Sequence, residues 1–366
     1  MKSTGQTEIR AMRPEEKKAV VAIMRRAFGP IQQLFFSLKG QVLVATDGDQ
    51  LLGGTVLDTF SLPGGRKGGI ILWIFTDPAV HGRGAGQALA EGAIGYFEEQ
   101  GCTDLFACVE GYNTSSSKLF ATRGFGILSP GEQIRRFGPA VVKMWYHTFH
   151  FVDVGHFLWS KPAPERPDNP NLQWWGSLLM NSILVWLALW SQHGFRSFNA
   201  AYLFIAPLIL LLFFGGRSLG MLAAARAQGV TLRYRAWESG FPLGAAIALA
   251  FGGFYPNPGG YYPTTDNWRY REWLGRLGPV ALAGVLPALL ITWTAWAAGS
   301  FIPLTEEIGL WRDLTLMIGV LLNLLDVVTA FFPLSSFNGR RLWDWKPWLW
   351  GIFALATILS IVVIVR

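Results

Sequence analysis

The first 149 residues alternate short hydrophobic segments with amphipathic ones, a pattern typical of a small α/β domain. Period-two alternation or a continuous apolar run predicts strands, and apolar residues at helical spacing predict helices. Strands are expected over 7–12, 41–45, 51–57, 70–75 and 105–109, and helices over 14–28, 82–101 and 115–122. The resulting order, β-α-β-β-β-α-β-α, predicts a sheet with both parallel and antiparallel neighbours.

After this region the chain changes character. Residues 150–173 include four prolines between positions 161 and 170, too many for a helix, and are predicted to be a linker. Apolar segments near the length of a bilayer crossing follow at 174–190, 198–215, 277–298, 309–332 and 348–365. Residues 174–366 are therefore predicted to be a polytopic membrane domain of about five spans, plus a re-entrant segment at 241–254.

Composition separates the same two regions. Residues 1–149 hold 29 of the 55 formal charges, whereas residues 150–366 hold 15 of the 17 tryptophans. The net charge of +7 comes from scattered basic residues, several of them beside apolar spans, so a nucleic-acid partner is not expected. Both cysteines, Cys102 and Cys108, lie in the first region, which indicates a reducing compartment and no disulfide framework.

The charges between the apolar spans predict an orientation. Two connections are rich in arginine and lysine, 217–276 and 340–346, and one connection carries Glu306 and Glu307 with no basic residue. Five spans with residues 1–173 in the cytosol place both basic connections inside, as membrane proteins prefer. We expect an integral protein of the cell inner membrane with the lipid bilayer as a partner.

The most informative motif is a glycine-rich turn between a predicted strand and a predicted helix. Glycines at positions 82, 84 and 86 lack a Cβ and let the backbone approach a ligand closely. Unpaired N–H groups and the helix dipole favour an anion at such a helix start. The turn predicts a pyrophosphate cradle, although many strand–helix turns contain glycine.

Two segments together resemble the GNAT family of N-acetyltransferases. His81-Gly82-Arg83-Gly84-Ala85-Gly86 resembles the family's (Gln/Arg)-x-x-Gly-x-(Gly/Ala) motif. Residues 113–125, from Asn113 to Phe125, resemble its Asn-x-x-Ala-x-x-Leu-Tyr-x-x-x-Gly-Phe segment. The resemblance covers about residues 6–145. It implies an α/β mixed-sheet GNAT domain, here followed by an all-α transmembrane domain.

The resemblance implies acetyl-CoA as co-substrate and direct attack of an acceptor amine on the thioester. Residues 1–149 would then be a GNAT-like acyl-CoA-binding domain. The backbone of the glycine turn would bind the pyrophosphate, and the strand end would bind the pantetheine arm. The implied cofactor-binding residues are Phe75, Thr76, Asp77, His81, Gly82, Arg83, Gly84, Ala85, Gly86, Asn113 and Phe120.

One position departs from the family pattern. Phe120 stands where the family often has a general-acid tyrosine, and a phenylalanine cannot donate a proton. Tyr112 or a water molecule is the expected substitute. Glu110 and Asp77 are the nearest carboxylates for the base that amine acetylation needs. For each carboxylate the alternative is a solvated loop acid.

The second half carries a different resemblance, over about residues 200–350. Segments 232–237, 281–284 and 332–339 look like parts of the site-2 protease family of intramembrane zinc proteases. In that family a His-Glu-x-x-His helix precedes the first segment, and the last segment supplies the third zinc ligand. The resemblance therefore predicts where a metal site would lie.

The ligands of that metal site do not carry over. The His-Glu-x-x-His positions fall on Arg217, Ser218 and Met221, and the ligand aspartate falls on Asn338. Because this set is unsuited to zinc, we expect no metal and no protease activity, and hence a pseudoprotease. Asp326 lies inside an apolar span and should face protein or water. It is expected either to accept a structural hydrogen bond or to line a groove.

Two functional hypotheses remain open. The first is a membrane-anchored N-acetyltransferase that uses acetyl-CoA, with the intact glycine turn in its favour. The alternative is a non-catalytic structural or adaptor subunit of a membrane complex, with protein partners in that complex. Phe120 and the lost zinc ligands favour this alternative.

Overall fold

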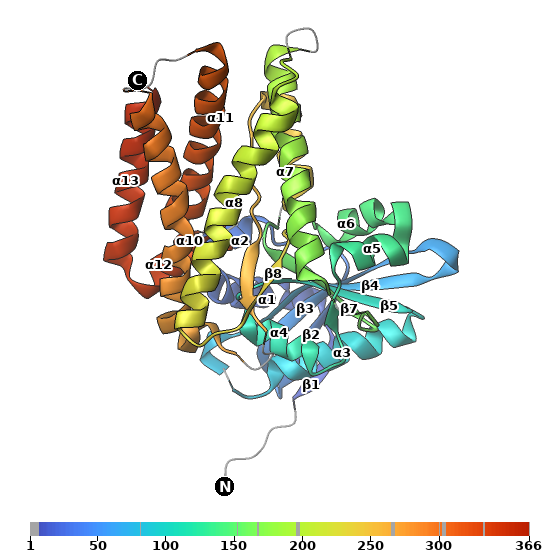
Figure 1. Ribbon diagram of the computed structural model, residues 1–366. Helices are drawn as coiled ribbons and strands as arrows, with labels where there is room; N and C mark the ends of the chain where they lie inside the picture. The colour runs from blue at the N-terminus through green and yellow to red at the C-terminus, as the bar shows by residue number, and fades with distance from the viewer. Residues whose placement is uncertain are drawn as a thin grey trace. The chain divides into compact units, whose positions relative to one another are not determined.

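A computed structural model describes residues 7–80, 82–151, 153–166, 168–194, 198–264, 268–299, 301, 305–331 and 334–365. The chain divides into two compact units (Figure 1). The first unit comprises Met1–Val109, Ser115–His150 and Phe157–Pro167. The second unit comprises Glu110–Thr114, Phe151–His156 and Asp168–Arg366.

The first unit is built on a seven-stranded mixed sheet in the order β1-β2-β3-β4-β5-β7-β6. Its first four strands pair antiparallel and β4 pairs parallel with β5, as the mixed sheet was expected to do. The strands are β1 (Glu8–Ala11), β2 (Gln41–Asp47), β3 (Gln50–Ser61), β4 (Lys67–Thr76), β5 (Asp104–Glu110), β6 (Gly126–Ile127) and β7 (His156–Lys161).

Helices cover both faces of this sheet. Val44 and Phe75 pack with α1 (Lys17–Ala27), whereas their chain neighbours Ala45 and Ile74 pack with α3 (Ala85–Glu99). Successive strand residues point to opposite faces, so α1 and α3 lie on opposite faces. The other helices are α2 (Pro30–Leu34), α4 (Thr114–Ala121), α5 (Pro130–Phe137) and α6 (Val141–Thr148).

The predicted elements of the first region are confirmed with shifted bounds. The five expected strands correspond to β1–β5, and the three expected helices correspond to α1, α3 and α4. Helices α2, α5 and α6 and strands β6 and β7 were not expected from the sequence. Strand β7 lies within residues 150–173, the segment expected to be a linker, and joins the sheet beside β5.

Within the described residues, the second unit has five helices long and apolar enough to cross a membrane, as many as the apolar segments found in the sequence. They are α7 (Pro170–His193), α8 (Tyr202–Ala227), α10 (Tyr270–Ala298), α11 (Glu306–Asn323), which continues into the π-helix Leu324–Val328, and α13 (Pro347–Val365). The short helices are α9 (Gly240–Phe251) and α12 (Asn338–Trp345). The all-α expectation needs one correction, because β8 (Leu232–Arg235) and β9 (Gly260–Pro263) form a two-stranded antiparallel sheet.

Small residues bring the central helices close together. A Cβ at Gly220 of α8 would lie 2.1 Å from the carbonyl oxygen of Ala283 on α10, so only glycine fits there. Close backbone approach through small residues is typical of helices that pack in membranes. Helix α8 also includes residues 217–227, beyond the apolar segment 198–215, because the backbone stays helical from Tyr202 to Ala227.

Candidate functional site

The glycine turn and the strand before it line a groove in the first unit. The groove has a volume of about 450 Å³. Phe75 and Thr76 at the end of β4 line it together with Gly82, Gly84 and Gly86. The structure therefore brings together five of the residues that the GNAT resemblance implies for the cofactor.

The turn has the backbone geometry that such a groove needs. Gly82 and Gly84 have φ angles of +86° and +77°, a region that side chains strongly disfavour. Gly84 is the N-cap of α3, so the first free N–H groups of that helix follow it directly. A Cβ built on either glycine would meet no atom within 4 Å. The space beside the turn thus fits an anionic group that approaches the backbone.

A further part of the groove lining comes from α4 and the two residues that follow it, and was not foreseen in the sequence. Its residues are Ser115, Ser116, Lys118, Leu119, Thr122 and Arg123. Lys118 is exposed, and Arg123 forms a 2.6 Å ion pair with Glu91 of α3. The charge of Lys118 and several hydroxyl groups complement a phosphate-rich ligand. The periodicity of α4 predicted a helix but not the direction of its polar face.

Three residues that were expected to bind the cofactor contact other parts of the protein instead. Asp77 forms a 2.6 Å ion pair with Arg26 and accepts a hydrogen bond from the Ala79 backbone; Arg26 holds the pKa of Asp77 below its usual value. The Arg83 guanidinium lies 3.9 Å from Asp47. Ala85 is buried in the contact between α3 and the sheet. None of the three lines the groove as described.

Two further expected cofactor residues, Phe120 and Asn113, also do not line the groove. Phe120 is only 2% exposed and packs edge-on against Phe125, with 5.2 Å between ring centroids. Asn113 is exposed, and its backbone N–H donates to the carbonyl of Glu110. His81 lies outside the described residues.

The expected acid and base, Tyr112 and Glu110, belong to the second unit. The hydroxyl of Ser335 donates a 2.7 Å hydrogen bond to Glu110. The ring of Tyr112 is buried against Tyr262, 5.0 Å between centroids, and beneath the guanidinium of Arg341 at 4.9 Å. Burial raises the pKa of Tyr112, while the charge of Arg341 lowers it. Tyr112 therefore keeps its proton at neutral pH, as a proton donor must.

Arg217 and Asn338, two of the positions that the resemblance assigns to the protease site, form a buried ionic cluster with Asp326 in the second unit. Arg217 Nε and Nη2 donate to the two carboxylate oxygens of Asp326 at 2.9 and 3.1 Å. Asn338 adds hydrogen bonds from its backbone N–H and its Nδ2, at 3.1 and 2.7 Å. Of the two expectations for Asp326, the structure has the hydrogen bond. Met221 and Asn338 both lie beside Gly284.

The comparisons with known proteins divide the chain in the same way. The family model described as the acetyltransferase (GNAT) family matches residues 11–125. A zinc metalloprotease-like protein of Methanocaldococcus jannaschii is 28% identical over 134 residues, which are 37% of this chain and 66% of that protein. Mycothiol acetyltransferase of Renibacterium salmoninarum is 25% identical over 116 residues, 31% of this chain and 33% of that protein. The chain thus spans between a third and two thirds of these relatives.

Solved acetyltransferases resemble only part of the chain. The IAA acetyltransferase of Bacillus cereus is 22% identical, with a TM-score of 0.28, and the match covers 34% of this chain and 79% of that one. N-acetylglutamate synthase of Neisseria gonorrhoeae, solved with coenzyme A and N-acetylglutamate, is 18% identical with a TM-score of 0.32; this match covers 42% and 34%. By the family match at residues 11–125, the N-terminal part of the chain is a GNAT acetyltransferase domain; the helical C-terminal part has a zinc metalloprotease-like relative, as the resemblance to site-2 proteases predicts.

Proposed function

We propose that the protein is a membrane-anchored N-acetyltransferase that transfers an acetyl group from acetyl-CoA to an amine. The observation that carries the proposal is the groove beside Gly82 and Gly84, with its left-handed glycines and the cation of Lys118. The family match at residues 11–125 supports acetyl transfer in general. The five apolar helices support the membrane anchor.

The chain's own residues suggest how the transfer would proceed. The backbone of residues 82–86 and Lys118 would bind the pyrophosphate, and the end of β4 at Phe75–Thr76 would bond the pantetheine arm. The amine nitrogen would form a bond to the acetyl carbon while the bond from that carbon to sulfur breaks. Glu110 would take the amine proton, and Tyr112 would give a proton to the thiolate. Asp77 is the weaker base, because its charge is stabilised by Arg26.

We further propose the arrangement of this protein in the cell. The domains would be residues 1–149 for acyl-CoA binding, 150–173 as the connection and 174–366 in the membrane, with α9 as the re-entrant segment. Acetyl-CoA is a cytosolic anion and the basic connections favour the cytosol, so the GNAT domain would face the cytosol at the inner membrane.

Turnover by the full chain in detergent tests the proposal. Release of free CoA from acetyl-CoA is measured with a thiol reagent in the presence of a panel of primary amines. Tyr112→Phe should lower kcat about 100-fold, the low end of the contribution of a general acid. Tyr146→Phe removes a hydroxyl from an exposed tyrosine and should leave kcat unchanged. Bound acetyl-CoA without CoA release for any amine would contradict catalysis.

The second candidate is a non-catalytic structural or adaptor subunit. The buried Phe120 at the family's tyrosine position and the ion pair at the protease ligand positions favour it. Purification from the native membrane would then yield a stable complex with other membrane proteins. A protein that purifies alone and releases CoA would exclude this role.

We also propose that the second unit holds no zinc and cleaves no peptide bond. Arg217 and Asn338 occupy the ligand positions and are bonded to Asp326. Elemental analysis of protein prepared in metal-free buffer should find less than stoichiometric zinc. Stoichiometric zinc that is lost in an Asp326→Asn variant would overturn this assignment.

A further inference from the structure

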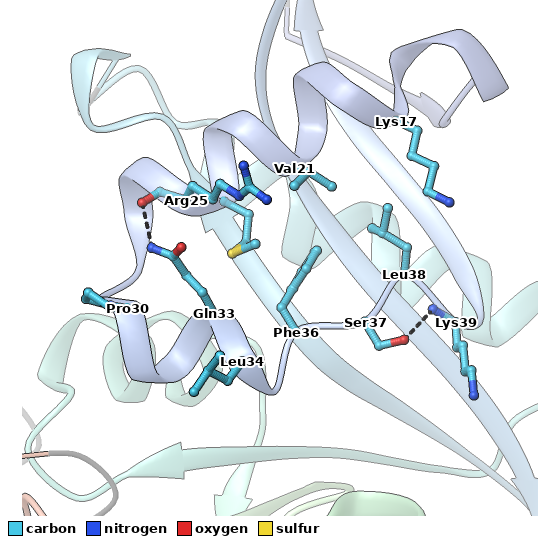
Figure 2. Close-up of a pocket in the computed structure, with 11 residues that line it drawn as sticks. Lys17, Val21, Arg25, Pro30, Gln33, Leu34, Phe36, Ser37, Leu38 and Lys39 are labelled. Carbon is cyan, nitrogen blue, oxygen red and sulfur yellow. Dashed lines mark hydrogen bonds between the residues drawn. The ribbon is translucent and has the colours of Figure 1, made fainter.

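The first unit has a second hollow, separate from the glycine groove. It lies between α1, α2 and the chain from Phe36 to Lys39, and its volume is about 660 Å³ (Figure 2). None of its lining residues also lines the glycine groove. The volume falls in the range of pockets that hold small organic ligands. This α1–α2 pocket is therefore a candidate for a different ligand.

The charge around the α1–α2 pocket is of one sign. Lys17, Arg25 and Lys39 line it, and no aspartate or glutamate does so among the described residues. In the described part of the chain these three cations form no ion pair, whereas the neighbouring Arg26 is paired with Asp77. Figure 2 shows Lys17 and Lys39 at one end of the hollow and Arg25 toward the other. The pocket therefore favours an anion.

The rest of the α1–α2 pocket is apolar. Val21, Met24, Phe36 and Leu38 pack on the core between α1 and the sheet and also line the hollow. The adjoining segment exposes large apolar side chains, with Leu34 81% and Phe35 57% exposed. A free inorganic anion or a nucleic-acid phosphate would use the cations and leave this surface in water. A ligand with an acidic head and a hydrocarbon body would use both features.

We propose that the α1–α2 pocket binds an anionic phospholipid of the bilayer in which the chain is anchored. The acidic headgroup would contact Lys17 and Lys39, and the glycerol and upper acyl chain would contact Phe36 and Leu38. Leu34 and Phe35 are suited to enter the boundary between headgroups and acyl chains, as apolar residues beside lysines and arginines do in proteins that lie on membranes. The five candidate spans make a bilayer available to the same chain.

Hydrogen–deuterium exchange of the full chain in nanodiscs tests this proposal. One set of discs contains phosphatidylcholine alone, and the others add increasing phosphatidylglycerol. Exchange of the amides over residues 30–39 should slow as phosphatidylglycerol is added. Lys17→Gln with Lys39→Gln should raise the phosphatidylglycerol content needed for half of this protection by up to about 30-fold, since each lysine near an anionic surface contributes about fivefold in affinity. Leu34→Ser should reduce the maximal protection.

The matched control is Lys18→Gln with Lys143→Gln. These two exposed lysines do not line the pocket, and their removal changes the net charge equally. An equal loss in the control, or protection that does not depend on phosphatidylglycerol, would overturn the proposal. Sodium octanoate is added to phosphatidylcholine discs as a soluble probe. Protection by octanoate equal to that by phosphatidylglycerol would mean a soluble acid as ligand and would overturn the lipid assignment.

Discussion

The glycine turn of the first unit and the Arg217–Asp326 cluster of the second lie where two resemblances place functional sites, yet they differ in what fills them. The turn leaves open space beside two left-handed glycines and the start of α3. In the cluster the Asp326 carboxylate already has protein partners, because it accepts hydrogen bonds from the side chains of Arg217 and Asn338. The glycine turn offers backbone groups to a ligand, whereas the Arg217–Asp326 cluster consists mainly of side chains that bind one another.

This difference shows which amino-acid substitutions each kind of site tolerates. A backbone cradle depends on glycine and on the position of a helix start, so the surrounding side chains can change freely. A metal site depends on a few side chains, and replacing them leaves buried polar groups that need new partners. Arg217 is 1% exposed, and its pairing with Asp326 supplies such partners. The cluster therefore joins α8, the π-helix and α12 through the side chains of Arg217 and Asp326 and through the side chain and backbone N–H of Asn338.

Breaking the cluster should have the largest effect. Arg217→Met leaves Asp326 charged and buried, and removal of one partner from a buried pair costs about 3–5 kcal/mol. The full chain in detergent should show this as a large fall in resistance to unfolding. The double variant Arg217→Met with Asp326→Leu removes both charges and should recover most of the loss. A double variant as unstable as the single one would mean that the ion pair is not what holds these helices.

A substitution in the glycine turn should lower the affinity for acetyl-CoA rather than the stability of the fold. Gly84→Val forces a branched side chain into a left-handed conformation and hinders the approach of the ligand to the backbone. Acetyl-CoA affinity, measured by calorimetry, should fall at least about tenfold, or about 1.4 kcal/mol. Gly95→Ala is the control, because Gly95 lies on the same helix with open space beside it. Unchanged affinity in Gly84→Val would refute the cradle.

The sequence predicted most of the first unit because its early elements have clear periodicity. Strands β1–β5 and helices α1, α3 and α4 follow local patterns of apolar residues. Strand β7 was missed because the prolines around it indicate a linker, and only its pairing within the sheet makes His156–Lys161 a strand. Helix α5 was missed as well, although Ser129 and Pro130 give it an N-cap and a first turn.

The site was only partly predictable for a related reason. The glycines and the end of β4 carry their role in local sequence, so the groove could be expected. The contribution of Lys118 and Arg123 depends on which face of α4 is turned to the groove, and the short helix has no clear pattern to show it. The contacts of Glu110 with Ser335 and of Tyr112 with Arg341 join positions more than 200 residues apart in sequence. Such contacts follow from tertiary structure alone.

The smallest expected effect comes from an ion pair near the surface, which sharpens the contrast with Arg217. Glu16 accepts hydrogen bonds from Arg10 and the Arg13 backbone, and the Arg10 side chain lowers the pKa of Glu16 from 4.5 to about 2. A carboxylate with a lowered pKa stabilises the fold above its ordinary pKa, and that contribution is lost as pH falls from about 4.5 toward 2. Glu16→Gln should therefore speed hydrogen exchange in α1 at pH 7. The loss of stability should be smaller than the loss that Arg217→Met causes in the second unit, because solvent and salt screen exposed ion pairs. The difference in exchange rate between Glu16→Gln and wild type should shrink as the pH falls from about 4.5 toward 2.

The control is Glu15→Gln, which should change the exchange rate little at any pH, since no side-chain hydrogen bond to Glu15 is found among the described residues. An equal effect of both variants would show that net charge, rather than the Arg10–Glu16 pair, is responsible.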